Sequence, residues 1–521
     1  MLKARYLPDP KTDNSDSTGV KDLPAFSVAH DMSSSYGFTS IHAYLHFVDD
    51  RTPAYPLGCI TADITPYIGS SVSALLTHIP LAILILVAIA TASAAILSPW
   101  GTWDAFKCTT NYGRDADLLR LITPGFGDCL QYIQFIFFSG SLTLNYPGFF
   151  QPATSSVGWS CLMFNQSFVT RNKASENLGP LGLVDGIYIT NSTRGLQATS
   201  QIIGMTNDRN IWAGMIIWLL VIILTILVLI QIGFAGRWIY RKLSHTREED
   251  LRAKNLPFSA GNVIRIAFNY FLLPLVAISM YELLIAGLAI QEMSSIIPVV
   301  FAAITLIMIM AFICWIFRVI TKSHPRSILF DDYPTVLLYG PLYNTYSDNA
   351  AAFALVPLLL TFVRGIAIGA VQSSGTAQLI ILIICEIILI LTLNAFRPFS
   401  SPTSMNTYHT LFSVIRLIIL LLMITFTPAL AVDDATRGWI AYVILILHTI
   451  VLLVGFFLHS LQTLVEVIAR LLGAGDDRGT ATRGGLVKVC SRRDLVWLQS
   501  NRISGLWRSS TVTSTSERWA W

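Results

Sequence analysis

The sequence predicts an all-α polytopic membrane protein with about nine transmembrane helices. The chain has 521 residues, of which 53% are hydrophobic and 13% are charged, whereas a soluble domain carries about 25% charged residues. Its mean hydropathy is +0.60, and long apolar runs recur between residues 74 and 465. Runs of this length suit helices that cross a bilayer. The composition therefore excludes an ordinary soluble domain.

Residues 1–73 precede the first apolar run and are polar and mixed in composition. Within them, 38–48 and 58–69 place β-branched and aromatic residues between turn signals, which predicts two short strands. The opening residues lack the apolar core of a secretory signal. Either the first apolar run acts as a signal-anchor, or the sequence lacks its true N-terminus. We expect 1–73 to lie on the luminal or extracellular side.

Nine apolar segments predict a transmembrane region over 74–470. Eight of them are long and strongly apolar. The weaker one, 126–144, is interrupted by Asp128, Gln131 and Gln134, and its alternative is an amphipathic helix lying in the membrane interface. The nine segments are 74–97, 126–144, 211–235, 263–290, 297–320, 350–371, 378–396, 405–427 and 438–465.

The distribution of basic residues favours nine spans with the N-terminus outside. The connectors that would face the cytosol then hold twelve Lys and Arg residues, and the three short outer connectors hold one, Arg437. Basic connectors are retained on the cytosolic side of membranes. In the alternative with eight spans, 126–144 does not cross, the chain starts inside, and the segment from Lys107 to Arg120 lies outside.

Two glycosylation sequons begin at Asn165 and Asn191, and both topologies place them outside. The tail, 471–521, is rich in Gly, Arg, Ser and Thr. We expect it to be a cytosolic, basic and disordered segment, with an amphipathic helix at the inner leaflet as the alternative. The protein is expected in the endoplasmic reticulum, a vacuolar or Golgi membrane, or the plasma membrane.

The sequence contains none of the common catalytic motifs. It has no P-loop, no HExxH and no GxSxG. Its nine histidines do not cluster, and its seven cysteines lack the spacing of a zinc site. We therefore predict no enzyme activity, no catalytic residue, no metal site and no cofactor. The expected partners are the lipid bilayer and a transported ion or small solute, and not nucleic acid.

Three stretches of the sequence together resemble one membrane-protein family. The first, 135–165, contains Gly-x-Leu-x-Leu-x-Tyr-Pro followed by a Trp-Ser pair; the second is YGPLY at 339–343; the third surrounds QSSGTAQ at 372–378. This combination resembles the fungal transient receptor potential (TRP)-like family, which includes flavin carrier and fungal polycystin-like proteins, over about 100–465. The matching residues are Gly140, Leu142, Leu144, Tyr146, Pro147, Trp159, Ser160, Tyr339, Gly340, Pro341, Gln372, Ser373, Ser374, Gly375 and Gln378.

The resemblance implies a transport protein, either a calcium-linked cation channel or a carrier of flavin adenine dinucleotide (FAD), and it is compatible with a homo-oligomer. It also implies that 1–73 is the remnant of a luminal ML-like β domain. A non-conducting scaffold that supports cell-wall or secretory functions is the alternative. A re-entrant pore helix with its filter needs on the order of 12–15 residues, and the last connector, 428–438, does not hold one comfortably.

Four ionisable residues occur at similar depth within the apolar segments. Arg364 and Glu386 lie on the two arms of the hairpin around QSSGTAQ, roughly 10–12 Å below its outer edge, and Glu282 and Arg416 reach a similar depth. A lone charge at mid-bilayer costs at least about 2.5–3.5 kcal/mol, so we expect Arg364 and Glu386 to pair. The layer either lines a transport path or fixes helix packing. An anionic solute would require Arg364 or Arg416.

Overall fold

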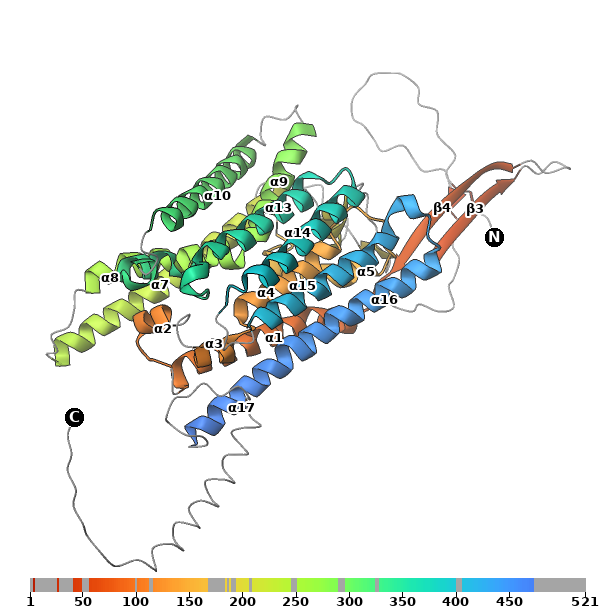
Figure 1. The fold of residues 1–521 in the computed structure, drawn as a ribbon. Coiled ribbons are helices and arrows are strands. Elements are labelled where there is room, and N and C mark those ends of the chain that lie inside the picture. The colour runs from red at the N-terminus through yellow and green to blue at the C-terminus, as the bar shows by residue number, and fades with distance from the viewer. Residues whose placement is uncertain are drawn as a thin grey trace, which may run out of the picture.

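Long helices run side by side and form an elongated bundle, and strands extend from one of its ends (Figure 1). The predicted all-α membrane fold agrees with this arrangement. The structure is a computed structural model that describes residues 3–4, 26–27, 41–48, 56–98, 101–111, 116–166, 183–184, 187–188, 194–205, 209–244, 251–288, 296–323, 328–399 and 405–472.

Seven helical segments in the described part of the chain are long and apolar enough to cross a membrane, and two helices joined at a 69° bend form an eighth if they count as one span. These eight coincide with eight of the predicted segments. The seven are Ser70–Leu97, Asn210–Leu243, Ile296–Lys322, Asp348–Ala370, Gly375–Phe396, Met405–Phe426 and Asp434–Leu471, and the bent pair is Ala253–Tyr270 with Leu272–Gly287.

The spans are built from ten α-helices and several shorter helical turns. The ten are α1 Ser70–Leu97, α7 Arg209–Ser244, α8 Leu251–Ile264, α9 Leu272–Leu288, α10 Ile296–Lys322, α13 Leu355–Ala370, α14 Gly375–Phe396, α15 Met405–Leu422, α16 Asp434–Ile450 and α17 His459–Leu471. Two π-helical segments, η3 Arg265–Tyr270 and η8 Val451–Leu458, join α8 to α9 and α16 to α17. The 3-10 turns are η1 Gly158–Cys161, η5 Asp348–Ala354, η6 Met423–Phe426 and η7 Pro428–Leu430. The short helices are α2 Ala105–Asn111, α3 Ala116–Ile122, α4 Phe126–Ser139, α5 Phe150–Ser155, α6 Gly195–Ile203, α11 Ile328–Asp331 and α12 Tyr333–Tyr343.

The ninth predicted span, 126–144, corresponds to α4. This helix has 14 residues, whereas a helix needs about 20 to cross a bilayer, so nine helical spans are not confirmed. An interfacial amphipathic helix does not fit either. Cys129, Ile133 and Phe137 are 0% exposed, and α4 packs against α1 and η1 inside the bundle.

The two strands predicted near the N-terminus are present. They are β3 Ile41–Val48 and β4 Pro56–Pro66, which pair antiparallel with Ile41 opposite Ile64. Two short strands, β5 Leu183–Val184 and β6 Ile187–Tyr188, extend this sheet in the order β3-β4-β6-β5. Two further strands, β1 Lys3–Ala4 and β2 Phe26–Ser27, pair separately. The ML-like character of this region stays a prediction.

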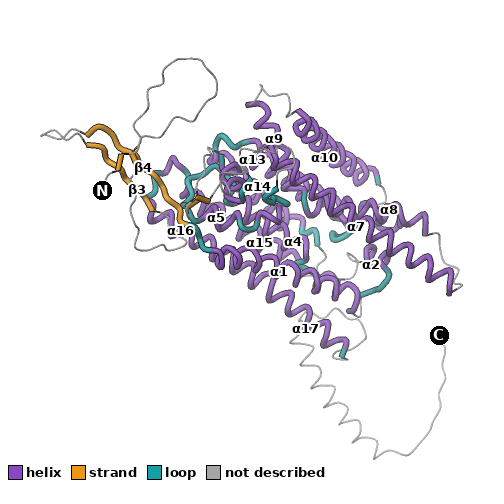
Figure 2. The backbone as a smooth tube through the Cα atoms, turned by 180° about the vertical axis from the view of Figure 1, so that it is seen from behind, coloured by secondary structure: helices purple, strands orange, loops and turns teal. Residues whose placement is uncertain are grey.

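The bundle has two distinct ends, and both views show the strands at one of them (Figures 1 and 2). At the strand end, β4 leads into α1. At the opposite end, which we call the basic end, Arg237 of α7 pairs with Asp104 (Nη1–Oδ1, 2.8 Å). There Arg120 of α3 also pairs with Glu466 of α17 (Nη2–Oε1, 2.7 Å).

Two glycines allow α13 to pack closely against α9. Gly365 and Gly369 are four residues apart and therefore lie on one face of α13. A Cβ at Gly369 would lie 2.0 Å from the carbonyl oxygen of Ala277, and one at Gly365 would lie 2.7 Å from Val276. Small residues at this spacing permit backbones to approach within membranes. The contact holds Arg364, next to Gly365, at a fixed depth.

The QSSGTAQ turn is tied to the chain that follows α4. Gln372 accepts from the hydroxyl of Thr143 (3.0 Å) and from the amide of Leu196 (3.3 Å), and it donates to Ile368 O (2.6 Å). Gln378 accepts from the amide of Thr143 (2.9 Å) and also donates to Ile368 O (3.0 Å). Both glutamines are buried. The two glutamines of the polar turn therefore provide hydrogen-bond partners for backbone groups at the strand end.

We expect Gly375→Ala to destabilise the fold, because a Cβ there would lie 1.8 Å from the carbonyl oxygen of Thr143. Overpacking of this kind costs about 1–3 kcal/mol. The control is Gly233→Ala in α7, where a Cβ would meet nothing within 4 Å. Melting curves of the purified full chain in detergent should show a lower melting temperature for Gly375→Ala alone. Equal melting temperatures for the two variants would contradict the tight contact.

Candidate functional site

A cavity of about 430 Å³ lies among α4, η3, α13, α14 and α15. Its lining includes Thr109 of α2 and Leu119 of α3, which belong to the basic end. It also includes three of the predicted intramembrane charges, Arg364, Glu386 and Arg416. The cavity therefore connects the basic end of the bundle with ionisable groups inside its membrane segments.

One wall of the cavity is the bend between α8 and α9. Pro274 has no N–H, so the carbonyl of Tyr270, four residues earlier, loses its helical donor. Gln134 of α4 supplies a replacement, donating from Nε2 to Tyr270 O at 2.9 Å. Gln131 similarly donates to Asn269 O at 2.6 Å. These glutamines, which weaken the apolar pattern of 126–144, hydrogen-bond to the backbone of the bend.

Glu386 lies between two arginines. Its Oε1 is 3.0 Å from Arg364 Nη2, the pair expected across the hairpin, and 2.9 Å from Arg416 Nε. Arg416 also donates from Nη2 to Glu386 Oε2 (3.2 Å) and to Ser413 Oγ (3.0 Å). The Glu386 side chain is 3% exposed, and those of Arg364 and Arg416 are 15% and 19% exposed. The cluster contains one carboxylate and two guanidinium groups.

Glu282 does not line this cavity. It is 2% exposed on α9. In the packing of α9 on α13, Gly365 meets Val276 and Gly369 meets Ala277 and Met280, so Glu282 lies beyond the level of Gly369. The predicted layer of four charges therefore separates into a cluster of three and one residue nearer the strand end. The similar membrane depth predicted for Glu282 therefore did not bring it into the cluster of the other three charges.

The first motif stretch folds at the strand end. Tyr146 donates its hydroxyl to Ser139 O at 2.5 Å and stacks on Phe150 at 5.1 Å. Pro147 O accepts from the amide of Phe150 (2.9 Å). A Cβ at Gly140 would overlap the side chain of Thr154. These contacts fix the turn that follows α4.

The remaining motif residues divide between contacts with α4 and the turn at the strand end. Ser160 O accepts from Gln134 Nε2 at 3.1 Å, and Trp159 precedes it in η1. Ser374 caps α14, because its hydroxyl accepts from the amide of Ala377 (3.3 Å). Ser373 is exposed.

The YGPLY stretch forms part of α12 at the basic end. Gly340 and Pro341 line the cavity, and Pro341 O accepts from Asn269 Nδ2 at 2.7 Å. Tyr339 accepts from Trp315 Nε1 at 2.9 Å. Asn269 belongs to the same bend that Gln131 contacts. The second motif stretch and α4, which leads into the first stretch, thus contact the same bend at the cavity wall.

The predicted glycosylation sites differ in what the structure describes. Asn165 is exposed and lies beside Gly204 at the end of α6. Asn191 lies outside the described residues, as does nearly all of the predicted tail, 471–521.

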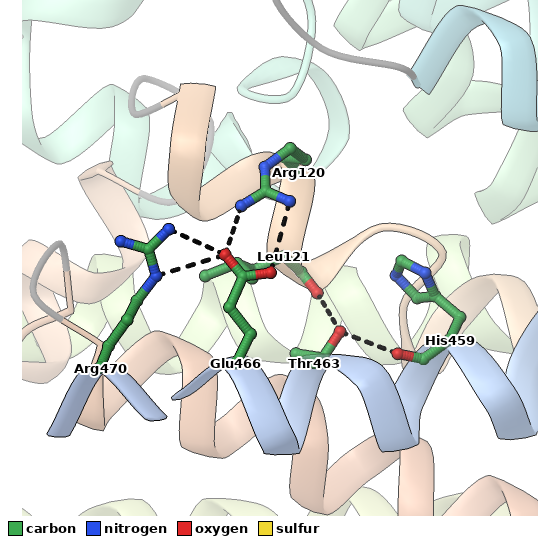
Figure 3. A network of polar contacts seen from close by, with 6 residues as sticks. All are labelled: Arg120, Leu121, His459, Thr463, Glu466 and Arg470. Atoms are coloured by element: carbon green, nitrogen blue, oxygen red, sulfur yellow. Dashed lines mark hydrogen bonds and ion pairs between the residues drawn. The ribbon is translucent and has the colours of Figure 1, made fainter. Parts of the chain in front are cut away.

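A second charge cluster at the basic end was not predicted from the sequence. Glu466 of α17 accepts from Arg120 of α3 (Nη2–Oε1, 2.7 Å) and from Arg470 (Nη2–Oε1, 2.9 Å), as Figure 3 shows. Thr463, one turn earlier on the same face, donates to Leu121 O at 3.1 Å. The spacing of Glu466 and Arg470 predicts a local pair. No local signal indicates Arg120, which is 346 residues away in sequence.

The Asp104–Arg237 pair joins the chain after α1 to α7. The hydrogen bond from Arg237 lowers the pKa of Asp104 below its ordinary value of 3.8. Asp104 is therefore ionised at neutral pH. Its contribution to stability is present above the unfolded-state pKa and is lost as the pH falls through the lower folded-state pKa.

Comparison with known proteins identifies the family. A family profile described as "Transient receptor potential (TRP) ion channel" matches residues 184–470, which is more than half of the chain. The chain belongs to this family. The predicted membership of a TRP-like family is thereby confirmed, and the second and third motif stretches lie within the matched residues.

An uncharacterized membrane protein of Schizosaccharomyces pombe is similar to this TRP-like chain. It is 29% identical over 392 residues, which are 73% of this chain and 44% of the relative. The chain thus spans less than half of that protein's length. No solved structure matches the chain described here. The TRP family and the apolar helices support an integral, multi-pass membrane protein.

We expect Gln134→Leu to destabilise this TRP-like protein, because it leaves the buried carbonyl of Ser160 and the partly buried carbonyl of Tyr270 without their donor. An unsatisfied buried polar group costs about 1–3 kcal/mol. Gln131→Leu is the matched control, since its hydrogen bond to Asn269 is exposed and should contribute less. Melting temperatures in detergent compare the two. A larger loss for Gln131→Leu would contradict the role of Gln134 at the bend.

Proposed function

We propose that this TRP-like protein moves an ion or small solute across its membrane, and that the cavity among α4, η3, α13, α14 and α15 is part of the path. The observation that carries the proposal is the cavity lining. It extends from Thr109 and Leu119 at the basic end to Glu386 within the membrane segments. A packed bundle needs no such opening, and ionisable groups inside membranes mark transport paths.

The basic end is proposed to face the cytosol and the strand end the lumen or the exterior. Arg120, Arg237 and Lys254 belong to the basic end, and basic residues are retained on the cytosolic side. In this topology, α4 together with the turn that follows it up to Thr143 completes a ninth crossing. Leu121, just before α4, contacts Thr463 near the basic end, and Thr143 contacts Gln372 at the strand end.

The solute is proposed to be either calcium or FAD. The family favours an ion, whereas the structure of the last connector argues against a conventional tetrameric pore. Between α15 and α16 the chain forms only the short turns η6 and η7, and a re-entrant pore helix with its filter needs on the order of 12–15 residues. A homo-oligomer remains compatible with either solute. A scaffold without transport activity is the competing proposal.

The transport proposal is tested with the full chain in liposomes, with calcium flux and FAD uptake measured in parallel. Thr361 lines the cavity, so Thr361→Phe should narrow it and reduce flux severalfold. The control is Thr225→Phe, whose side chain is exposed on α7 and away from the cavity. Absence of flux for both solutes in folded protein would favour the scaffold. Equal flux in the two variants would show that the cavity is not part of the transport path.

Native cysteines test the topology. Cys59 is exposed on β4 at the strand end, and Cys108 lies on α2 at the basic end. In sealed microsomes with the cytosolic face outward, an impermeant maleimide should label Cys108, and Cys59 only after detergent is added. Variants Cys59→Ser and Cys108→Ser identify each signal.

Burial raises the pKa of the Cys108 thiol, so the labelling requires a mildly alkaline buffer. Labelling of Cys59 before Cys108 would reverse the proposed orientation. A glycan on Asn165 provides an independent check of the luminal side.

A further inference from the structure

We propose that Arg364 is the anion-binding residue of the cavity and takes one carboxylate or phosphate group of a small soluble anion that enters from the basic end. The proposal deepens the transport function above and rests on it. It divides the roles of the two arginines around Glu386: Arg416 neutralises the carboxylate, and Arg364 is available to a ligand.

Arg416 and Arg364 contact Glu386 differently. Arg416 donates two hydrogen bonds, one to each carboxylate oxygen, and a third to Ser413. Paired hydrogen bonds of this kind are the strongest arginine–carboxylate arrangement. Arg364 makes a single close approach to Oε1 at 3.0 Å, and its buried Nε and Nη2 have no hydrogen-bond acceptor among the described residues. Glu386 therefore keeps its main partner if Arg364 turns to a ligand.

The charges around the cavity leave one positive charge in excess. Three arginines line it, Arg265, Arg364 and Arg416, against two carboxylates, Asp128 and Glu386. The Asp128 carboxylate accepts from the amide of Gly125 at 2.9 Å and so caps the start of α4. Burying an uncompensated charge is costly. An anion in the cavity would restore neutrality, whereas a calcium ion would add to the excess.

The binding step is an exchange of partners without a covalent change. Arg364 releases Glu386 Oε1 and donates to the anionic group of the solute, while Arg416 retains the carboxylate. The exchange replaces one charge contact by another, so its energetic cost is small compared with exposing an unpaired arginine to the interior. Guanidinium groups suit this role because their planar donors match carboxylate and phosphate oxygens.

The experiment measures the melting temperature of the full chain in nanodiscs of phosphatidylcholine, titrated with pyrophosphate at constant ionic strength. Wild type should be stabilised in a saturable manner, because a ligand that binds only the folded state raises its stability. Arg364→Gln should lose roughly ten- to hundredfold in apparent affinity, as expected for a lost hydrogen bond to a charged group, with a nearly unchanged melting temperature without ligand. The matched control is Arg318→Gln on the exposed face of α10, which should bind as wild type does.

Two more variants test the division of roles. Arg416→Gln should lower the melting temperature without ligand more than Arg364→Gln does, because it removes both hydrogen bonds to Glu386. Glu386→Gln should bind pyrophosphate more tightly than wild type, because it releases both arginines. The proposal is overturned if pyrophosphate does not stabilise wild type, or if Arg364→Gln binds it as well as wild type does.

A lipid headgroup carries the same chemistry, so the titration is repeated in nanodiscs that contain phosphatidylglycerol and no pyrophosphate. An Arg364-dependent shift there alone would overturn the soluble-anion form of the proposal. Calcium flux that is unchanged in Arg364→Gln, without a pyrophosphate shift, would overturn this inference and leave the transport function in place. If pyrophosphate raises the melting temperature in an Arg364-dependent manner but the protein transports neither solute, the binding site is supported and the transport proposal is wrong.

Discussion

The hydrocarbon core of a bilayer offers no hydrogen-bond partners, so each polar group inside it must be satisfied by the protein itself. This constraint explains the position of α4. Pro274 leaves the carbonyl of Tyr270, at the bend between α8 and α9, without its helical donor. Gln134 of α4 replaces that donor, and Gln131 donates to the neighbouring carbonyl of Asn269. A short helix with polar side chains is therefore retained at the centre of the bundle.

The same constraint accounts for the polar turn between α13 and α14. Gln372 and Gln378 connect that turn to Thr143, just after α4. Together with the glutamines at the bend, they attach α4 and the chain that follows it to two separate spans. The cavity lies beside this attachment, so its shape depends on hydrogen bonds as well as on apolar packing.

Carboxylates at two levels of the bundle follow one pattern. Glu386 lies between Arg364 and Arg416, and Glu466 lies between Arg120 and Arg470. Glu466 lies at the basic end, where the two arginines add to the positive charge that orients membrane proteins. Glu386 lies inside the membrane segments and lines the cavity, where a second arginine is costly and is proposed to serve a ligand.

Under the proposed transport function, the position of the cavity and its charge cluster are in keeping with a gated path rather than an open pore. The cavity reaches the interior from the basic end, and the Gln372–Thr143 contacts lie at the strand end. A structure open on one side is the arrangement expected of a carrier in one of its states. The short connector between α15 and α16 is in keeping with this interpretation.

The sequence by itself determined the membrane class, eight of the spans, the two N-terminal strands, the family and the proximity of Arg364 to Glu386. The family came from the resemblance of three motif stretches, and the others follow from apolar length, from period or from a short connector, which are local properties of the chain. Only the tertiary structure decided that α4 is enclosed, that Arg416 holds Glu386, that Glu282 lies apart and that Arg120 meets Glu466. These depend on which faces of distant helices meet, and helical depth gives a residue's level in the membrane but not its direction around the helix axis.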